Sequence, residues 1–230
     1  MRPLIAIAGV IAFVAVAAMA SIAPAGPVAR TDVPDATPTV FEWPAAQPTE
    51  WPMRAHPHLL SGFGLPIAAG VLPSDEAYLP NSPRDYRAGY HEGIDFPVNA
   101  GTAVLAAKTG AILRIDSAFT EWSVAEAQAA FDAARALGYT PDATLDRIRG
   151  RQVWIDHGDG IVTRYAHLSA VEPLRVGDVV TQGQVIGAVG SSGYPEGGPH
   201  LHFEIRVGDD FYGDGLALPE LRFAIRAAFR

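Results

Sequence analysis

The stretch His200-Leu201-His202-Phe203-Glu204-Ile205 alternates polar with apolar residues. Such alternation is typical of a half-buried β-strand, in which residues two positions apart share a face. His200 and His202 are therefore expected to project side by side, about 6 to 7 Å apart at the backbone. Similar short runs, which Gly, Asp and Pro separate, predict strands at 103–107, 110–115, 152–156, 161–166, 179–180, 185–189 and 201–207. The pattern predicts a mainly β fold, with antiparallel sheets in a sandwich or partly open barrel.

Two segments depart from this β pattern. Residues 118–149 are predicted to form a helical hairpin insertion, with a capping box at Ser123 and Glu126, a helix end at Gly138 and a second helix that Thr140-Pro141 opens and that reaches Arg149. This insertion could narrow a cleft and select substrate, or only cover a sheet edge. Residues 218–230 predict a C-terminal helix, because Leu221, Ile225 and Ala228 share one helical face. Packing on the domain is expected for it, with a membrane or wall polymer as the alternative contact.

The start of the chain indicates export. Arg2 precedes an apolar run over residues 4–20, and Ala18-Met19-Ala20 fits a signal peptidase site. Residues 1–24 are thus expected to be a signal peptide or an uncleaved N-terminal anchor, and 25–54 a Pro- and Ala-rich linker. Residues 55–230 then form one domain, in the periplasm or outside the cell. The formal net charge of −8 makes nucleic acid an unfavourable partner, and the oligomeric state stays open.

Histidines and an aspartate supply the side chains of a catalytic metal site. They lie in the motifs His91-Glu92-Gly93-Ile94-Asp95, Tyr165-Ala166-His167-Leu168-Ser169 and Gly198-Pro199-His200-Leu201-His202-Phe203-Glu204, and the chain has no cysteine. Two imidazoles and one carboxylate make the three-ligand set that catalytic zinc commonly uses, whereas structural zinc sites are closed by four protein ligands. A straight strand would hold His91 and Asp95 about 13 Å apart, so a bend at Gly93 is required.

These motifs resemble the lysostaphin-type and LytM-type zinc endopeptidases, which cut peptide cross-links in bacterial peptidoglycan. The resemblance runs from about Ser61 to Arg206 and includes residues 61–64, 91–96, 155–160, 165–169, 176–187 and 198–206. It implies a β fold of the duplicated hybrid motif type, with one zinc ion per chain at the floor of a groove. It also implies that His91, Asp95 and His202 bind the metal and that His167 and His200 are catalytic residues that do not bind it.

The resemblance implies an endopeptidase that acts on stem or bridge peptides of peptidoglycan. Zinc lowers the pKa of a bound water, and His167 and His200 can orient that water, carry a proton or stabilise the oxyanion. The sequence does not divide these roles, and it leaves open whether direct D-amino-acid cross-links or glycine-rich bridges are cut. Glu92 and Glu204 are alternatives for a direct chemical role, against a supporting or solvent-facing one.

The other predictions concern residues around this site. The loop between Phe63 and His91, with Tyr78, Tyr86 and Tyr90, is expected to form one wall of the groove. His157 precedes a Gly-Asp-Gly turn and is expected to be structural, and His56 and His58 are expected to be linker residues.

Two alternative functions remain beside the endopeptidase. One is an exported binding or activator module of the same fold that acts on other cell-wall hydrolases. The other arises because residues 174–187 also resemble biotinyl or lipoyl carrier domains, which carry a modified lysine at a hairpin tip. Lys108 is the only lysine in the chain and lies far from this run, which disfavours the carrier.

Overall fold

The structure is a computed structural model that describes residues 59–68 and 70–230. All of them belong to the second of the two units into which the chain divides, residues 50–230. The predicted leader, the linker, His56 and His58 lie outside the described residues and stay predictions. Within the described part, no helix has both the length and the apolar composition to cross a membrane.

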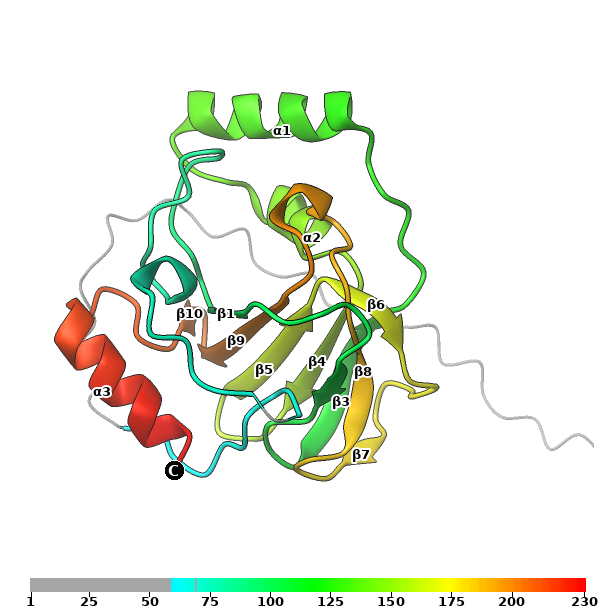
Figure 1. Cartoon of the computed structure of the whole chain (residues 1–230), viewed down its shortest axis with the longest axis vertical. Helices are drawn as coiled ribbons and strands as arrows, with labels where there is room; N and C mark the ends of the chain where they lie inside the picture. Colours follow the sequence, from blue (N-terminus) through cyan, green and yellow to red (C-terminus); the bar gives the residue numbers. More distant parts are fainter. Residues whose placement is uncertain (1–58, 69) are drawn as a thin grey trace, which may run out of the picture. The chain divides into compact units, whose positions relative to one another are not determined.

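Two antiparallel sheets form the fold (Figure 1). The larger sheet has the order β1-β9-β5-β4-β3-β7, with β10 also beside β9, and the smaller has the order β2-β8-β6. Neither sheet closes on itself, and the mainly β, antiparallel fold that the sequence predicts is confirmed. The strands are β1 (Ile94–Phe96), β2 (Ala103–Leu105), β3 (Gly110–Asp116), β4 (Gln152–Asp156), β5 (Ile161–Ala166), β6 (Leu168–Val171), β7 (Val179–Val180), β8 (Val185–Val189), β9 (Leu201–Val207) and β10 (Asp210–Phe211).

One buried hydrophobic cluster joins the two sheets. It takes Ile155, Tyr165 and Phe203 from the larger sheet, and Val104 and Ile186 from the smaller one. The hydroxyl of Tyr165 accepts a hydrogen bond of 2.7 Å from the backbone N–H of Ala107, so the polar end of this buried ring has a partner. The shared core fixes the larger sheet, on which the candidate site is built.

Strand β9 is buried on both faces, and the expectation of a half-buried strand is wrong. Residues 201–205 are all buried, and Glu204 is completely so. On one side the ring of Phe203 lies 6.0 Å from that of Phe229, beyond the end of helix α3 (Leu218–Ala228). On the other side His202 and Glu204 contact charged residues. The alternation of polar and apolar residues along β9 therefore reflects two buried faces. One face packs in the apolar core, and the other contacts the charged groups of the site.

Helix α3 packs on the domain, as expected. Its buried residues include Leu221, Ile225 and Ala228, which the sequence places on one face. Backbone hydrogen bonds from Gly62 and Phe63 to the carbonyls of Arg230 and Ala228 hold the chain end against the start of the described region. The apolar face of this helix is thus used within the domain.

The insertion forms two helices, α1 (Val124–Leu137) and α2 (Asp142–Arg149), as the sequence predicts. The capping box of Ser123 and Glu126 is present, and Gly138 ends α1 with a φ of 78°. Figure 1 shows α2 between α1 and the large sheet. The short 3-10 helices of the domain are η1 (Glu76–Tyr78) and η2 (Pro195–Gly197).

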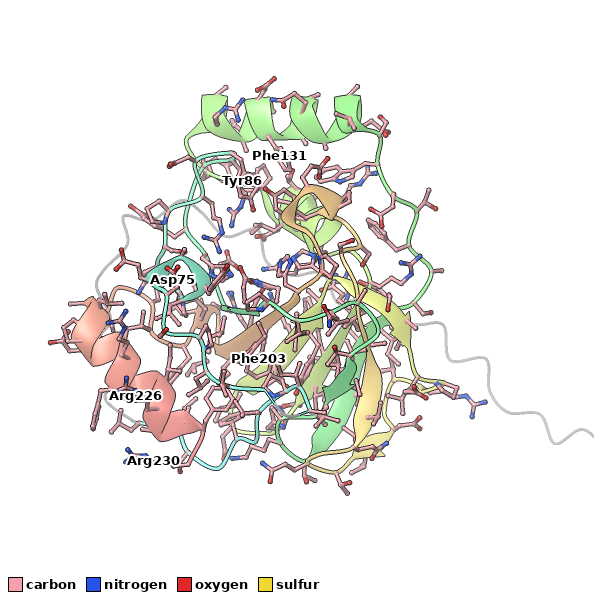
Figure 2. The ribbon with its side chains drawn as sticks, viewed as in Figure 1. Asp75, Tyr86, Phe131, Phe203, Arg226 and Arg230 are labelled. Atoms are coloured by element: carbon pink, nitrogen blue, oxygen red, sulfur yellow. The ribbon has the colours of Figure 1, made fainter. Side chains whose placement is uncertain are left out.

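The insertion has a small hydrophobic core of its own, which we call the insertion cluster. It consists of Trp122, Ala127, Phe131, Leu145 and Ile148, and Tyr86 and Tyr194 pack against it. Figure 2 shows Tyr86 and Phe131 beneath α1. The rings of Tyr86 and Phe131 are 5.2 Å apart and meet edge to face. The insertion therefore packs on two loops, and the alternative that it only covers a sheet edge is wrong.

We expect Phe131→Ala to destabilise the protein by about 3 to 5 kcal/mol, because it leaves a cavity in the insertion cluster. Val124→Ala on the same helix is the matched control, since Val124 is 76% exposed, and a change within about 0.5 kcal/mol is expected. Urea unfolding followed by tryptophan fluorescence measures both. Equal stability of the two variants would show that the cluster contributes little.

Candidate metal centre

Strand register brings the site residues together. His202 in β9 is opposite Asp95 in β1 on one side and opposite Ala166 in β5 on the other. His167 directly follows Ala166, and His200 directly precedes β9. Three separate motifs of the sequence therefore meet where β5 ends and β9 begins.

The bend that the sequence requires at Gly93 is present. A Cβ atom at this position would lie 2.5 Å from the carbonyl oxygen of Phe203 and 3.0 Å from Cε1 of His202. Only glycine allows β1 to approach β9 so closely at the turn. The bend returns His91 toward Asp95, and their side chains meet.

His91, Asp95 and His202 form a triangle of donor atoms. Nε2 of His91 lies 2.9 Å from Oδ1 of Asp95 and 2.9 Å from Nδ1 of His202. Nδ1 of His202 lies 2.9 Å from the same Oδ1. Donors bound to zinc at about 2.0 to 2.2 Å in a tetrahedron lie roughly 3.4 Å apart, so this triangle needs little expansion to hold the ion. Among the described residues, these three make up the group that could hold a metal.

Hydrogen bonds behind the two rings set which nitrogens face each other. Nδ1 of His91 lies 3.0 Å from the carbonyl of Leu79, and Nε2 of His202 lies 3.0 Å from the carboxylate of Glu204. Both partners only accept, so each neutral ring carries its proton on that side. The other two nitrogens then point lone pairs at each other and at the Asp95 carboxylate. A cation relieves this repulsion, and the donor set fits zinc.

Arg84 holds the second oxygen of Asp95. Its guanidinium donates to Oδ2 at 3.1 Å, which leaves Oδ1 in the triangle. Burial raises the pKa of Asp95, but the facing imidazoles of His91 and His202 outweigh burial and hold it well below its usual value. Burial lowers the pKa of His91. Asp95 is therefore a carboxylate near neutral pH.

A buried charge network supports His202 from behind. The carboxylate of Glu204 accepts hydrogen bonds from Arg149 at 2.7 Å and from Arg164 at 3.3 Å, and Arg149 also binds Glu92. Burial raises the pKa of Glu204, but Arg149 and Arg164 bring it well below its usual value. The solvent-facing alternative for Glu204 is wrong, since it is fully buried and contacts the outer nitrogen of His202.

His167 and His200 lie beside the triangle. Their rings are 4.5 Å apart, and the ring of His167 is 5.8 Å from that of His202. Nδ1 of His167 donates to the carbonyl of Ser192 and Nδ1 of His200 to the carbonyl of Gly198, both at 2.9 Å. Burial, with His200 and His202 nearby, lowers the pKa of His167 to about 3. His167 is thus neutral near pH 7, and its Nε2 is a hydrogen-bond acceptor.

The backbone of His167 adopts an unusual conformation that the structure holds in place. Its φ of 60° is in the left-handed region, which non-glycine residues rarely adopt. Its N–H donates to the carbonyl of Arg149, the last residue of α2. Strain of this kind persists only where the surroundings fix it. Helix α2 therefore helps to place a predicted catalytic residue.

A cavity of about 430 Å³ opens over these side chains. Its wall includes Tyr78 and Tyr86, as predicted, but not Tyr90, which is 61% exposed. Leu145, Ile148 and Arg149 of α2 also line the cavity, in keeping with the expectation that the insertion could narrow a cleft. Within the predicted wall, the sequence did not single out Arg84 and Arg87, since they belong to no recognisable motif. The lining residues are Ala77, Tyr78, Pro83, Arg84, Asp85, Tyr86, Arg87, His91, Glu92, Asp95, Pro97, Leu145, Ile148, Arg149, His167, Tyr194, Gly197, Pro199, His200, His202 and Glu204.

His157 lies in the turn between β4 and β5, where it was expected to be structural. Its ring nitrogens contact the carbonyl of Thr109 at 2.9 Å and the hydroxyl of Thr163 at 2.8 Å. It is not among the residues that line the cavity.

Part of the chain is similar to a known family of peptidases. Residues 133–213 match the model of peptidase family M23, a span that contains His167, His200 and His202, whereas His91 and Asp95 precede it. The relatives include the DD-carboxypeptidase/endopeptidase Mpg of Neisseria meningitidis, which is 36% identical over 60% of this chain and 26% of its own length. Lysostaphin of Staphylococcus staphylolyticus is 31% identical over 54% of this chain and 20% of its own length. The predicted resemblance to lysostaphin-type and LytM-type peptidases is thus confirmed over this part of the chain.

A further relative has a name that refers to sporulation. Stage II sporulation protein Q of Bacillus subtilis is 41% identical over 40% of this chain and 31% of its own length. The matched regions thus span between a fifth and a third of the length of these three relatives.

We expect Glu204→Gln to weaken zinc binding about 10- to 100-fold, because the variant removes the carboxylate that orients His202. Competition with a chromophoric chelator measures the affinity. Glu220→Gln is the control, since Glu220 is an exposed residue of α3 and its loss leaves the site intact. Equal affinities of the two variants would exclude a supporting role for Glu204.

Proposed function

We propose that this protein is a zinc-dependent endopeptidase that cleaves peptide cross-links in bacterial peptidoglycan. The observation that carries the proposal is the triangle of His91, Asp95 and His202, with two further histidines beside it in one cavity. The match of residues 133–213 to a peptidase family model supports the reaction class. The triangle supplies the three ligands that a catalytic zinc ion commonly has.

The metal and the histidines have separate tasks in this proposal. When bound by His91, Asp95 and His202, zinc lowers the pKa of water and polarises a carbonyl group. His167 and His200 each have one ring nitrogen fixed by a backbone carbonyl and the other unprotonated in the neutral ring. Such a nitrogen orients a water molecule, accepts its proton and passes it to the leaving amine.

The location and substrate in this proposal follow from the sequence. The predicted leader supports a location in the periplasm or outside the cell, where peptidoglycan is found. Stem and bridge peptides are the proposed substrates. The printed name of the Neisseria relative, which describes a DD-carboxypeptidase and endopeptidase, supports a cell-wall peptide of this kind.

A second candidate is an exported module that keeps the fold without turnover and acts on other proteins of the cell wall. The relative that is named as a sporulation protein, and not as a peptidase, favours it. Both candidates predict the same fold, so only an assay of turnover separates them.

We expect the purified protein to release peptide fragments from isolated cell-wall sacculi, and His202→Ala to release none, because the variant lacks a metal ligand. Mass spectrometry of the products identifies the cut bond. Removal of zinc by a chelator should abolish the release, and added Zn²⁺ should restore it.

His157→Gln is the matched control, since it removes a histidine that lies outside the cavity. Its fragments should equal those of the wild type. Fragments that are the same for wild type and His202→Ala would defeat the proposal and favour the second candidate.

We expect His167→Ala and His200→Ala each to lower kcat about 10²- to 10⁴-fold while the protein still binds one zinc ion. Proton transfer is lost, but the three ligands remain. Metal analysis and steady-state kinetics on a cross-linked peptide test this division. Loss of zinc from either variant would instead place that histidine among the ligands.

A further inference from the structure

Arg87 is a buried cation in the wall of the cavity. The residue is 8% exposed, and it lines the same cavity as His91 and Asp95. Its guanidinium donates to the carbonyls of Ala88 and Tyr90 and to the hydroxyl of Thr140. All of these acceptors are neutral. Nε of Arg87 is also buried and has no hydrogen-bond partner among the described residues.

The other two arginines of the cavity have carboxylate partners. Arg84 binds Asp95 at 3.1 Å, and Arg149 binds Glu92 at 2.6 Å and Glu204 at 2.7 Å. No carboxylate of the described residues lies within ion-pair distance of Arg87. Charges that are removed from water are usually paired. Within the described part of the chain, the positive charge of Arg87 therefore has no carboxylate partner.

The acidic groups of the cavity do not fill this role. Glu92 and Glu204 are bound to Arg149, and Asp95 is bound to Arg84. Asp85 also lines the cavity, but it is exposed, so water solvates its charge. Of the three arginines that line the cavity, Arg87 is thus the one without a carboxylate partner among the described residues. It is the guanidinium that an anion in the cavity would bind.

The insertion holds the segment of Arg87 in place. Arg135 of α1 donates to the carbonyl of Tyr86 at 2.6 Å, and Thr140 between α1 and α2 bonds with the segment at Ala88. The rings of Tyr86 and Tyr194 are stacked, 4.8 Å apart and inclined by 17°. A cation that is fixed in this way loses little freedom when it binds an anion, which favours recognition.

We propose that Arg87 binds a carboxylate of the substrate, so that the enzyme acts on peptides with a free carboxylate near the cut bond and disfavours uncharged glycine-rich bridges. The inference rests on the proposed function and names its substrate class. Guanidinium and carboxylate form charge-assisted, often bidentate hydrogen bonds, which supply both energy and orientation.

The test compares two forms of one substrate, a cross-linked peptide dimer released from sacculi and the same dimer with its carboxylates converted to carboxamides. We expect the wild type to cleave the carboxylate form with a kcat/KM about tenfold or more above that of the amide form. In Arg87→Gln this preference should disappear, through a higher KM for the carboxylate form alone. Equal kcat/KM values of the wild type for both forms would overturn the proposal without any variant.

Two variants separate recognition from a structural role. Arg226→Gln removes the same charge from an exposed position on α3, which Figure 2 labels, and should keep the preference. Arg87→Lys should retain part of it, because the charge remains. Equal losses for both substrate forms in Arg87→Gln would show that Arg87 only supports the loop, and would overturn the proposal.

Failure of the proposed function can be told apart from failure of this inference. Isothermal titration calorimetry measures binding of the two dimers whether or not they are cleaved. A protein that cleaves neither form but binds the carboxylate form more tightly through Arg87 would contradict the endopeptidase and support the recognition. Equal binding of both forms would overturn the recognition.

Discussion

The pairing of His202 with Asp95 on one side and Ala166 on the other is the constraint on which the site depends. A one-residue slip of β9 would turn His202 to the opposite face and remove it from the triangle. The close approach at Gly93 and the fully buried core around Tyr165 and Phe203 fix this register. The chemistry at the site is thus maintained by the same packing that stabilises the sheet.

Buried charge is the second determinant of the arrangement. The metal triangle brings two lone pairs and a carboxylate together, and Glu204 adds another carboxylate directly behind His202. Arg84 and Arg149 supply compensating charge. Arg84 pairs with Asp95 in the triangle, and Arg149 pairs with Glu204 behind His202. Without such partners, each buried carboxylate would take up a proton or leave the interior. The arginines therefore help to keep Asp95 and Glu204 ionised.

Local patterns in the sequence predicted much of this structure. The capping box at Ser123, the helix end at Gly138 and the bend at Gly93 each depend on neighbouring residues and are confirmed. The gathering of the histidines was also expected, from the residue types in three motifs and from the resemblance of these motifs to a known family. Strands β1, β6 and β10 were missed, since they are only two to four residues long and are defined by their partners. The burial of Glu204 was missed because its arginine partners come from distant parts of the chain.

The insertion contacts both the wall of the cavity and the charge network behind His202. Its hydrophobic cluster packs on Tyr86 and Tyr194, which line the cavity, and Arg149 at the end of α2 binds Glu204 and accepts the backbone hydrogen bond of His167. An element with contacts to both the wall and the supporting network cannot shift without moving both. The insertion therefore couples the shape of the cavity to the position of its histidines.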